Sequence, residues 1–127
     1  MSRIEHVALF AADPAALKTF YEEAFGLRVV VDNRHTNPPG YFLAGDGGSA
    51  LEVIGRPANQ PAVNQRHVCH VAFQVEDYHA ARADLERRGA HFEPDTEVLN
   101  DSTRTGFFND PEGNRCQIVW RSQPLGQ

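Results

Sequence analysis

The sequence predicts an α+β protein built from two βαβββ modules. Its 127 residues, 41% hydrophobic and 23% charged, are enough for one compact domain. The chain also repeats itself, because the tetrapeptide HVAL at residues 6–9 recurs as HVAF at residues 70–73. Near the end of each half, the apolar stretches that begin at Glu52 and Gln117 match at almost the same shift. Several matches in nearly one register indicate two copies of one structural unit.

The first copy has the pattern of a strand, a helix and three further strands. Residues 4–10 are apolar enough for a buried strand. Asp13 and Pro14 then offer an N-cap followed by proline at the first helical position, and Gly26 suits the left-handed residue that ends a helix. Three strands are expected after the helix, over residues 27–31, 41–44 and 50–54.

The second copy repeats this order. A strand is expected over residues 67–75, and a helix capped by Asp77 runs to Gly89. Three strands are expected after it, near residues 90–92 or slightly later, over 104–108 and over 115–120. The first of these three has the weakest pattern, since its start could lie several positions either way within 90–103.

The predicted organisation is a single domain over residues 1–127. It consists of module 1 (about 1–55), a linker (about 56–65) rich in Pro, Asn and Gln, and module 2 (about 66–122). The net charge of −5 argues against a nucleic-acid surface, and no apolar run is long enough to span a bilayer. The N-terminus does not have the pattern of a secretion signal, and the two cysteines do not suggest a disulfide framework. We therefore expect a cytoplasmic protein that binds a small-molecule substrate or ligand, with no nucleic-acid or membrane partner.

Four polar residues occupy matching positions on the predicted strands. His6 and His70 lie on the first strand of each copy, and Glu52 and Gln117 lie on the last. Any one of them could be a hydrogen-bonded or outward-facing residue, and most histidines bind no metal. Their pairing across the repeat favours a site, because a pseudo-twofold axis would bring all four together. Two imidazoles, one carboxylate and one amide oxygen suit a divalent ion such as Zn²⁺, Ni²⁺, Co²⁺, Mn²⁺ or Fe²⁺.

These stretches resemble the vicinal oxygen chelate superfamily, which includes glyoxalase I, methylmalonyl-CoA epimerase, extradiol dioxygenases and the fosfomycin- and bleomycin-resistance proteins. The matching segments are IEHVALFAADPAALKTFYEEAFGL, SALEVIG, HVCHVAFQVEDYHAARADLERRGA and RTGFFNDPEGNRCQIVW, of which FFNDPEGN is the most specific. The resemblance implies two βαβββ modules in an open, eight-stranded barrel-like sheet with the helices outside. It also implies a homodimer and metal ligands at His6, Glu52, His70 and Gln117.

One position departs from the commonest pattern of the family. The last strand usually offers a carboxylate where this chain has Gln117. That difference counts against dioxygenase and fosfomycin-transferase chemistry, whose two-His-one-carboxylate sites take the carboxylate from this strand. Glyoxalase-like and epimerase-like relatives do mix Glu and Gln in a four-ligand site, generally with the glutamine at another position. Three interpretations of the site therefore remain open: it is functional, it holds little metal, or it no longer catalyses a reaction and only binds a ligand.

The resemblance implies a metal-dependent lyase or isomerase of the glyoxalase I type, acting on a small carbonyl compound or its thiol adduct. Proton transfer would proceed through a metal-stabilised enediolate, with Glu52 as the catalytic base, because an amide such as Gln117 takes up no proton at neutral pH. The alternatives are a non-catalytic drug-binding protein of the bleomycin-resistance kind and a ring-cleaving dioxygenase. Retention of His6, Glu52 and His70 favours the enzyme.

The remaining polar candidates have simpler interpretations. Strand alternation turns Cys69, Cys116 and His67 away from the proposed ligands, so the cysteines should pack as small apolar residues. Arg34 and Arg104 could meet an anionic substrate, although solvated arginines are the commoner case. Three further histidines are expected on the surface, namely His35, His79 and His91.

Overall fold

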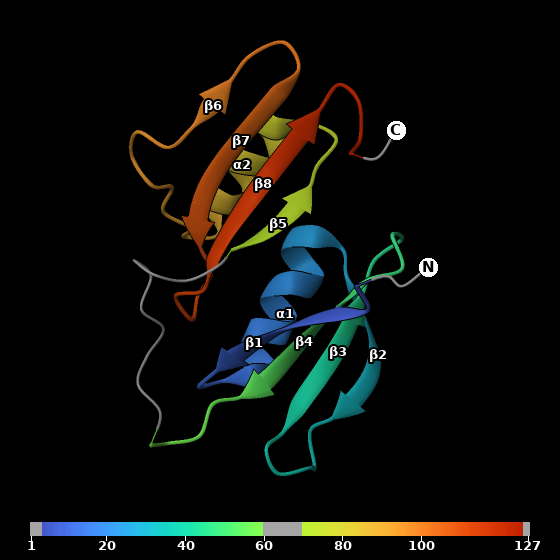
Figure 1. Cartoon of the computed structure of the whole chain (residues 1–127). Coiled ribbons are helices and arrows are strands. Elements are labelled where there is room, and N and C mark those ends of the chain that lie inside the picture. The colour runs from blue at the N-terminus through green and yellow to red at the C-terminus, as the bar shows by residue number, and fades with distance from the viewer. Residues whose placement is uncertain (1–3, 60–69, 126–127) are drawn as a thin grey trace. The chain divides into compact units, whose positions relative to one another are not determined.

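The computed structural model describes residues 4–59 and 70–125 of the chain. These residues form two compact units, with the division between Ala62 and Val63. Each unit contains one helix and one four-stranded mixed sheet (Figure 1).

Unit 1 contains one helix and the strands β1 to β4. Its elements are β1 (His6–Ala11), α1 (Pro14–Phe25), β2 (Arg28–Asn33), β3 (Gly40–Ala44) and β4 (Ala50–Gly55). The strand order in the sheet is β1-β4-β3-β2, with β1 parallel to β4 and the other neighbours antiparallel. Placing β1 beside β4 brings the first and last strands of the unit together, although they are far apart in sequence.

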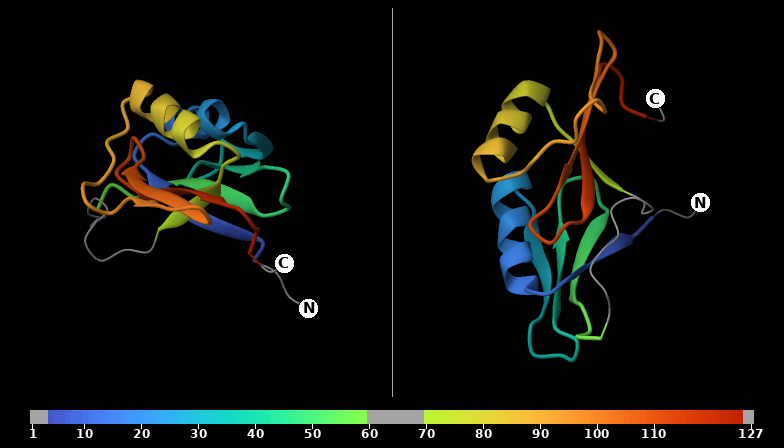
Figure 2. Two further views of the ribbon diagram at one scale, coloured as in Figure 1. Left: turned by 90° about the horizontal axis from the view of Figure 1, so that it is seen from above. Right: turned by 90° about the vertical axis from the view of Figure 1, so that its left-hand side faces the viewer.

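Helix α1 begins and ends where the sequence predicts. The Asp13 carboxylate accepts a hydrogen bond of 3.0 Å from the backbone N–H of Ala16, and Gly26 ends the helix at φ 66°. Leu17 and Tyr21 are fully buried on the face of α1 that packs against the sheet. The helix therefore covers one face of this sheet and leaves the other face without a helix of its own unit (Figure 2).

Unit 2 repeats this arrangement with shorter outer strands. Its elements are β5 (Val71–Gln74), α2 (Tyr78–Arg87), β6 (Val98–Leu99), β7 (Thr103–Asn109) and β8 (Arg115–Arg121). The strand order is β5-β8-β7-β6, with β5 parallel to β8. The carboxylate of Asp77 caps α2 through a 3.0 Å hydrogen bond from the N–H of Ala80.

The strand registers confirm the repeat. Val7 lies opposite Leu51 in unit 1, and the residues that match them, Val71 and Cys116, lie opposite each other in unit 2. The predicted α+β class with two βαβββ modules is therefore confirmed. The described strands form two sheets of four, rather than one sheet closed into a barrel.

The strand expected near residues 90–92 or slightly later lies at the late end of the range 90–103 that the sequence left open. Near residues 90–92, Phe92 makes a single bridge to Phe108, and the strand itself is the two-residue β6. Its position is set by the turn that follows, where the side-chain Oδ1 of Asn100 accepts hydrogen bonds from the N–H groups of Ser102 and Thr103. An Asx turn of this kind fixes the start of the β6–β7 hairpin.

Four sequence-based expectations lie at least partly outside the described residues. They are the later part of the linker (60–65), the beginning of the strand expected over 67–75, His67 and Cys69, all within the segment 60–69. Within residues 4–59 and 70–125, no helix has both the length and the apolar character needed to cross a membrane.

Candidate functional site

In unit 1 the proposed ligands lie on the sheet face opposite α1. Tyr41, Leu43, Leu51 and Val53 are buried toward the helix, so strand alternation turns the residues between them to the other face. Phe42 and Glu52 are therefore directly opposed across β3 and β4 on this open face. Ala8 lies on the other side of Glu52, in the parallel ladder with β1.

His6 is held between two carboxylates. Its Nδ1 is 2.8 Å from Oε1 of Glu5, and its Nε2 is 3.7 Å from Oε1 of Glu52. The edge of its ring meets the ring of Phe42, with the centroids 5.2 Å apart and the planes at 82°. Because a carboxylate only accepts hydrogen bonds, Nδ1 donates to Glu5, and Nε2 faces Glu52.

This pair of side chains fits one part of a metal site. Two donor atoms on one tetrahedral ion, each about 2.1 Å from it, are about 3.4 Å apart. The 3.7 Å between His6 Nε2 and Glu52 Oε1 is close to that separation. Metal-bound histidines commonly give their other ring N–H to a carboxylate, as His6 gives Nδ1–H to Glu5. The chemistry and spacing of these donors therefore suit a divalent ion.

In unit 2 the matching residues occupy matching positions. Gln117 lies between Ala72 of β5 and Phe107 of β7, as Glu52 lies between Ala8 and Phe42. His70 comes directly before β5, and the edge of its ring meets Phe107 with the centroids 4.9 Å apart at 86°.

The structure thus brings His6 and Glu52 together in one unit. In the other unit, His70 meets the ring of Phe107, which is the register partner of Gln117. In the part of the chain that the structure describes, no three His, Cys, Asp or Glu side chains form a group able to hold a metal. Neither unit therefore offers a complete site of these residue types by itself. The four-ligand site stays a prediction.

Unit 2 adds a charged pair that the sequence analysis missed. Arg115 lies two residues before Gln117, and its guanidinium sits over the ring of Phe107, 3.8 Å from the centroid. Its Nε donates a 2.9 Å hydrogen bond to Oε2 of Glu93. This pair places a neutralised cation beside Gln117, where unit 1 has Ala50. The 65-residue shift could have drawn attention to Arg115, but its pairing with Glu93 depends on the fold.

A second polar cluster lies between α2 and the segment before β6. Oη of Tyr78 donates a 2.5 Å hydrogen bond to Glu97, which also pairs with Arg82. Burial and the hydrogen bond to Glu97 raise the pKa of Tyr78 to about 12. The hydrogen bond from Tyr78 in turn holds the pKa of Glu97 below its ordinary value. This cluster fastens the 93–99 segment to the helix and lies away from the proposed ligands.

The remaining sequence candidates have ordinary environments. Cys116 is fully buried, as expected for a cysteine that packs as a small apolar residue. Arg34 pairs with its neighbour Asp32 at 3.5 Å, and Arg104 stacks on Trp120 with its guanidinium carbon 4.8 Å from the ring centroid. Three histidines are exposed, namely His35, His79 and His91.

Comparisons with known proteins agree with this architecture. The uncharacterized protein YaeR of Escherichia coli (strain K12) is 30% identical over 118 residues, covering 89% of this chain and 92% of YaeR. The crystal structure of TnmS3, an antibiotic binding protein from Streptomyces sp. CB03234, has a TM-score of 0.73 at 21% identity and covers 96% of this chain and 98% of TnmS3. A mutant of the fosfomycin resistance protein FosX from Listeria monocytogenes, complexed with Mn(II) and 1S,2S-dihydroxypropylphosphonic acid, has a TM-score of 0.73 at 16% identity and covers 98% of this chain and 93% of FosX.

The two solved structures show likeness of fold. The family model matches residues 3–118, which is most of the chain and includes all four proposed ligands. This chain therefore belongs to the Glyoxalase/Bleomycin resistance protein/Dioxygenase superfamily.

Proposed function

We propose that the protein is a metal-dependent lyase or isomerase of the glyoxalase I type, which moves a proton at a carbon next to a carbonyl group. The proposed ligands are His6, Glu52, His70 and Gln117, acting on one divalent ion, and the substrate is a small carbonyl compound or its thiol adduct. Support for a metal comes from a structural neighbour, FosX, whose crystal structure contains Mn(II).

The observation that carries the proposal is the arrangement of His6. Its Nδ1 is engaged by Glu5 at 2.8 Å while its Nε2 faces Glu52 at 3.7 Å. A metal-bound histidine commonly gives its other ring N–H to a carboxylate, as Glu5 accepts here, and Glu52 would then be a second ligand of the same ion. The repeat supplies a second histidine, His70, against a matching phenylalanine.

Each of the four proposed ligands would have the role that its side-chain chemistry allows. A divalent ion at such a site supplies positive charge that stabilises the oxygen anions formed as a proton leaves the neighbouring carbon. Glu52 is the one ionisable carboxylate among the four, so it would take up that proton. Gln117 would donate an amide oxygen and no base, because an amide is not protonated at neutral pH. Phe42 and Phe107, which flank these residues in the two sheets, would keep water from the carbon acid.

Metal loading followed by proton exchange tests this proposal. Purified protein is stripped with a chelator, loaded in turn with Ni²⁺, Co²⁺, Zn²⁺ and Mn²⁺, and freed of excess metal. We expect about one ion per chain for at least one metal, measured by mass spectrometry of the acid digest. The loaded protein should then incorporate solvent deuterium into hemithioacetals of methylglyoxal, followed by NMR. Metal without any exchange on a broad panel of α-ketoaldehyde adducts would contradict the proposed reaction.

A drug-binding role is the second candidate, and Gln117 is the observation that favours it. An amide in place of a carboxylate weakens a metal site, and the structural neighbour TnmS3 is an antibiotic binding protein. Protein that takes up none of the four metals after loading would support this role over the enzyme. Tight binding of an antibiotic by the metal-free protein, without any change in the drug, would then establish it.

The proposed assembly is a homodimer, as the family resemblance implies. Light scattering at micromolar concentration should give about twice the 14.1 kDa mass of the chain. A stable mass near that of a single chain would contradict a dimer.

A further inference from the structure

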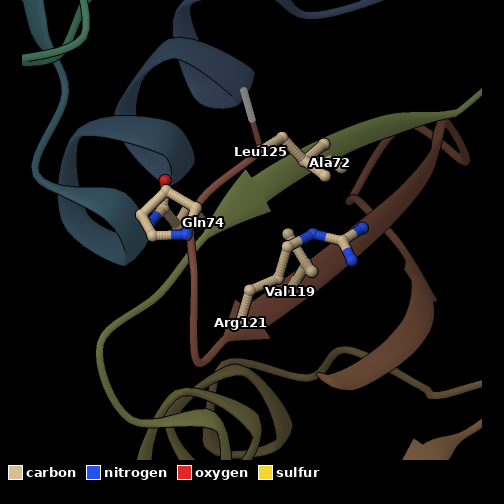
Figure 3. A pocket seen from close by; sticks show the side chains of 6 residues that line it. Ala72, Gln74, Val119, Arg121 and Leu125 are labelled. Atoms are coloured by element: carbon tan, nitrogen blue, oxygen red, sulfur yellow. The ribbon is translucent and has the colours of Figure 1, made fainter. Parts of the chain in front are cut away.

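A pocket of about 250 Å³ opens on the sheet face of unit 2 that also carries Gln117 (Figure 3). Its floor is formed by β5 and β8, and the segment after β8 forms one side. The lining residues are Ala72, Gln74, Val119, Arg121, Pro124 and Leu125. Four of the six are apolar, so the polar character of the pocket comes from one amide and one guanidinium.

Arg121 differs from the other described cations of its unit. Four arginines pair with carboxylates and a fifth, Arg104, stacks on Trp120. Arg121 has neither kind of partner among the residues that the structure describes, although its side chain is partly buried. A guanidinium that is partly withdrawn from water and has no anion beside it favours an anionic ligand.

Among its described residues, unit 1 has an arginine without a partner at the matching position of the repeat. Arg56 matches Arg121 at the 65-residue shift, and its Nη1 is buried without a hydrogen-bond partner. Within residues 4–59 and 70–125, these two arginines alone among the cations have neither an acidic nor an aromatic partner. In the part of the chain that the structure describes, two repeat-related positions thus both carry an arginine without an acidic or aromatic partner.

The pocket lies on the same two strands as the proposed metal ligand Gln117. Ala72, which lines the pocket, is the register neighbour of Gln117. Arg121 lies four residues further along the same strand, so its Cα is about 13 Å from that of Gln117. A molecule that reached from Gln117 to Arg121 would lie over Val119 and against Leu125.

We propose that this pocket binds the acidic end of a small organic acid. The anionic group pairs with the Arg121 guanidinium, the Gln74 amide donates a further hydrogen bond, and an apolar chain lies against Val119, Pro124 and Leu125. This inference extends the proposed function by naming a substrate class, an elongated carbonyl compound with a terminal carboxylate or similar anion. Binding in the pocket itself requires no metal, so the two proposals can be tested separately.

The test uses chelator-treated, metal-free protein and three probes of one shape. They are 4-phenylbutyrate, its neutral amide and the cationic 4-phenylbutylamine, each titrated into ¹⁵N-labelled protein. We expect the acid to bind at least about tenfold more tightly than the amide, and the amine to bind most weakly. The backbone signals that shift should include Ala72, Gln74, Val119 and Leu125. Equal affinity for acid and amide, no binding of either, or shifts elsewhere would overturn the proposal.

Three substitutions sharpen the result. Arg121→Gln should abolish the preference for the acid, whereas Arg121→Lys keeps the charge and should retain most of it. Arg28→Gln is the matched control, since Arg28 is an exposed arginine of unit 1 that pairs weakly with Asp46 at 3.8 Å. An unchanged preference in Arg121→Gln, or the same loss in Arg28→Gln, would contradict the assignment. Acid binding without metal uptake would contradict the proposed enzyme and support the anion-binding pocket. Metal uptake without a preference for the acid would contradict the pocket and leave the proposed enzyme in place.

Discussion

The two units share a backbone plan and differ in the side chains placed on it. On the open faces, Glu52 and Gln117 occupy the same register position, each beside an alanine and a phenylalanine. Unit 1 surrounds its histidine with carboxylates, whereas unit 2 places an Arg115–Glu93 pair next to Gln117. The two units therefore share the same backbone geometry on this face but differ in the charge of the side chains placed there.

The helix-facing sides differ in how they fill volume. Tyr41 of β3 is buried beneath α1, and the matching position in β7 is Gly106. The space is filled instead by Tyr78, which comes from the helix α2. Both units thus bury a tyrosine at this place, contributed by the strand in one and by the helix in the other. Equivalent packing does not require equivalent residues.

The largest expected effects come from two single substitutions, one that turns the carboxylate of Glu52 into an amide and one that turns the amide of Gln117 into a carboxylate. Glu52→Gln should abolish turnover while retaining some metal, because two histidines and two amides remain as ligands. Gln117→Glu should bind metal more tightly and stay active, since it adds a second anionic ligand. Metal stoichiometry and deuterium exchange of both variants provide the measurement. Full metal and wild-type exchange in Glu52→Gln would show that the base lies elsewhere.

Gly106→Ala should be the most damaging small change on the helix-facing side of unit 2. A Cβ at this position would clash with Oη of Tyr78 and come within 3.1 Å of the Phe92 ring. We expect the free energy of unfolding to fall by about 1–3 kcal/mol, measured by urea denaturation. Adding Tyr78→Phe removes the clashing oxygen and should make the double variant less destabilised than the two single losses combined. Additive losses would show that the contact is not the cause.

The Tyr78 cluster should also give unit 2 an alkaline limit of stability. The pKa of Tyr78 is raised from 10.0 to about 12, so the folded state favours the neutral phenol. The neutral phenol of Tyr78 therefore adds to the free energy of unfolding. This contribution, up to about 2–3 kcal/mol, is fully present below pH 10 and is lost as the pH rises through about 12. Thermal unfolding of the wild type and of Tyr78→Phe between pH 8 and pH 12 measures it. The variant should lack this part of the alkaline decline, and parallel curves would contradict the assignment.

Glu97 should act in the opposite direction on the acid side. Its pKa is lowered by the hydrogen bond from Tyr78, so its stabilising contribution is present above the ordinary glutamate pKa and is lost as the pH falls through the lowered value. Glu97→Gln should therefore flatten the decline of stability in acid. Glu86→Gln is a suitable control, because Glu86 also pairs with Arg82 but does not contact Tyr78.

The sequence predicts those features that are set by residues close together in the chain, and it misses those that depend on contacts between distant residues. The caps at Asp13 and Asp77 depend on residues three positions away, and both were predicted correctly. The repeat also placed Glu52 and Gln117 at one register position. The position of strand β6 was left open within residues 90–103, and the segment before it is held by the contact of Glu97 with Tyr78, 19 residues earlier in the chain.

The charged features of the open face were missed for the same reason. Arg115 pairs with a carboxylate 22 residues away, and no spacing rule predicts such a pair. The pocket at Arg121 depends on Pro124 and Leu125, which follow the last strand and have no periodic pattern. A comparison of Arg56 with Arg121 at the 65-residue shift was available from the sequence alone and would have drawn attention to both.

The smallest expected effect concerns Glu5, whose carboxylate accepts a hydrogen bond from Nδ1 of His6. Among the described residues, no carboxylate does the same for His70. Glu5→Gln removes the negative charge that holds Nδ1 of His6. We expect metal affinity to fall about tenfold, with the fold unchanged. Competition with a chelating dye measures the affinity. Glu23→Gln is the matched control, as an exposed glutamate of α1, and an equal loss there would contradict a specific role for Glu5.

The proposed function depends most on His6 and His70 acting as ligands of one divalent ion. Metal content per chain of His6→Ala and His70→Ala, after loading under identical conditions, tests it most directly, with exposed His35→Ala as the control. We expect about one ion per chain in the wild type and in the control, and a sharp loss in both ligand variants while circular dichroism stays unchanged. Wild-type metal content in either His6→Ala or His70→Ala, or two ions per chain in the wild type, would contradict it.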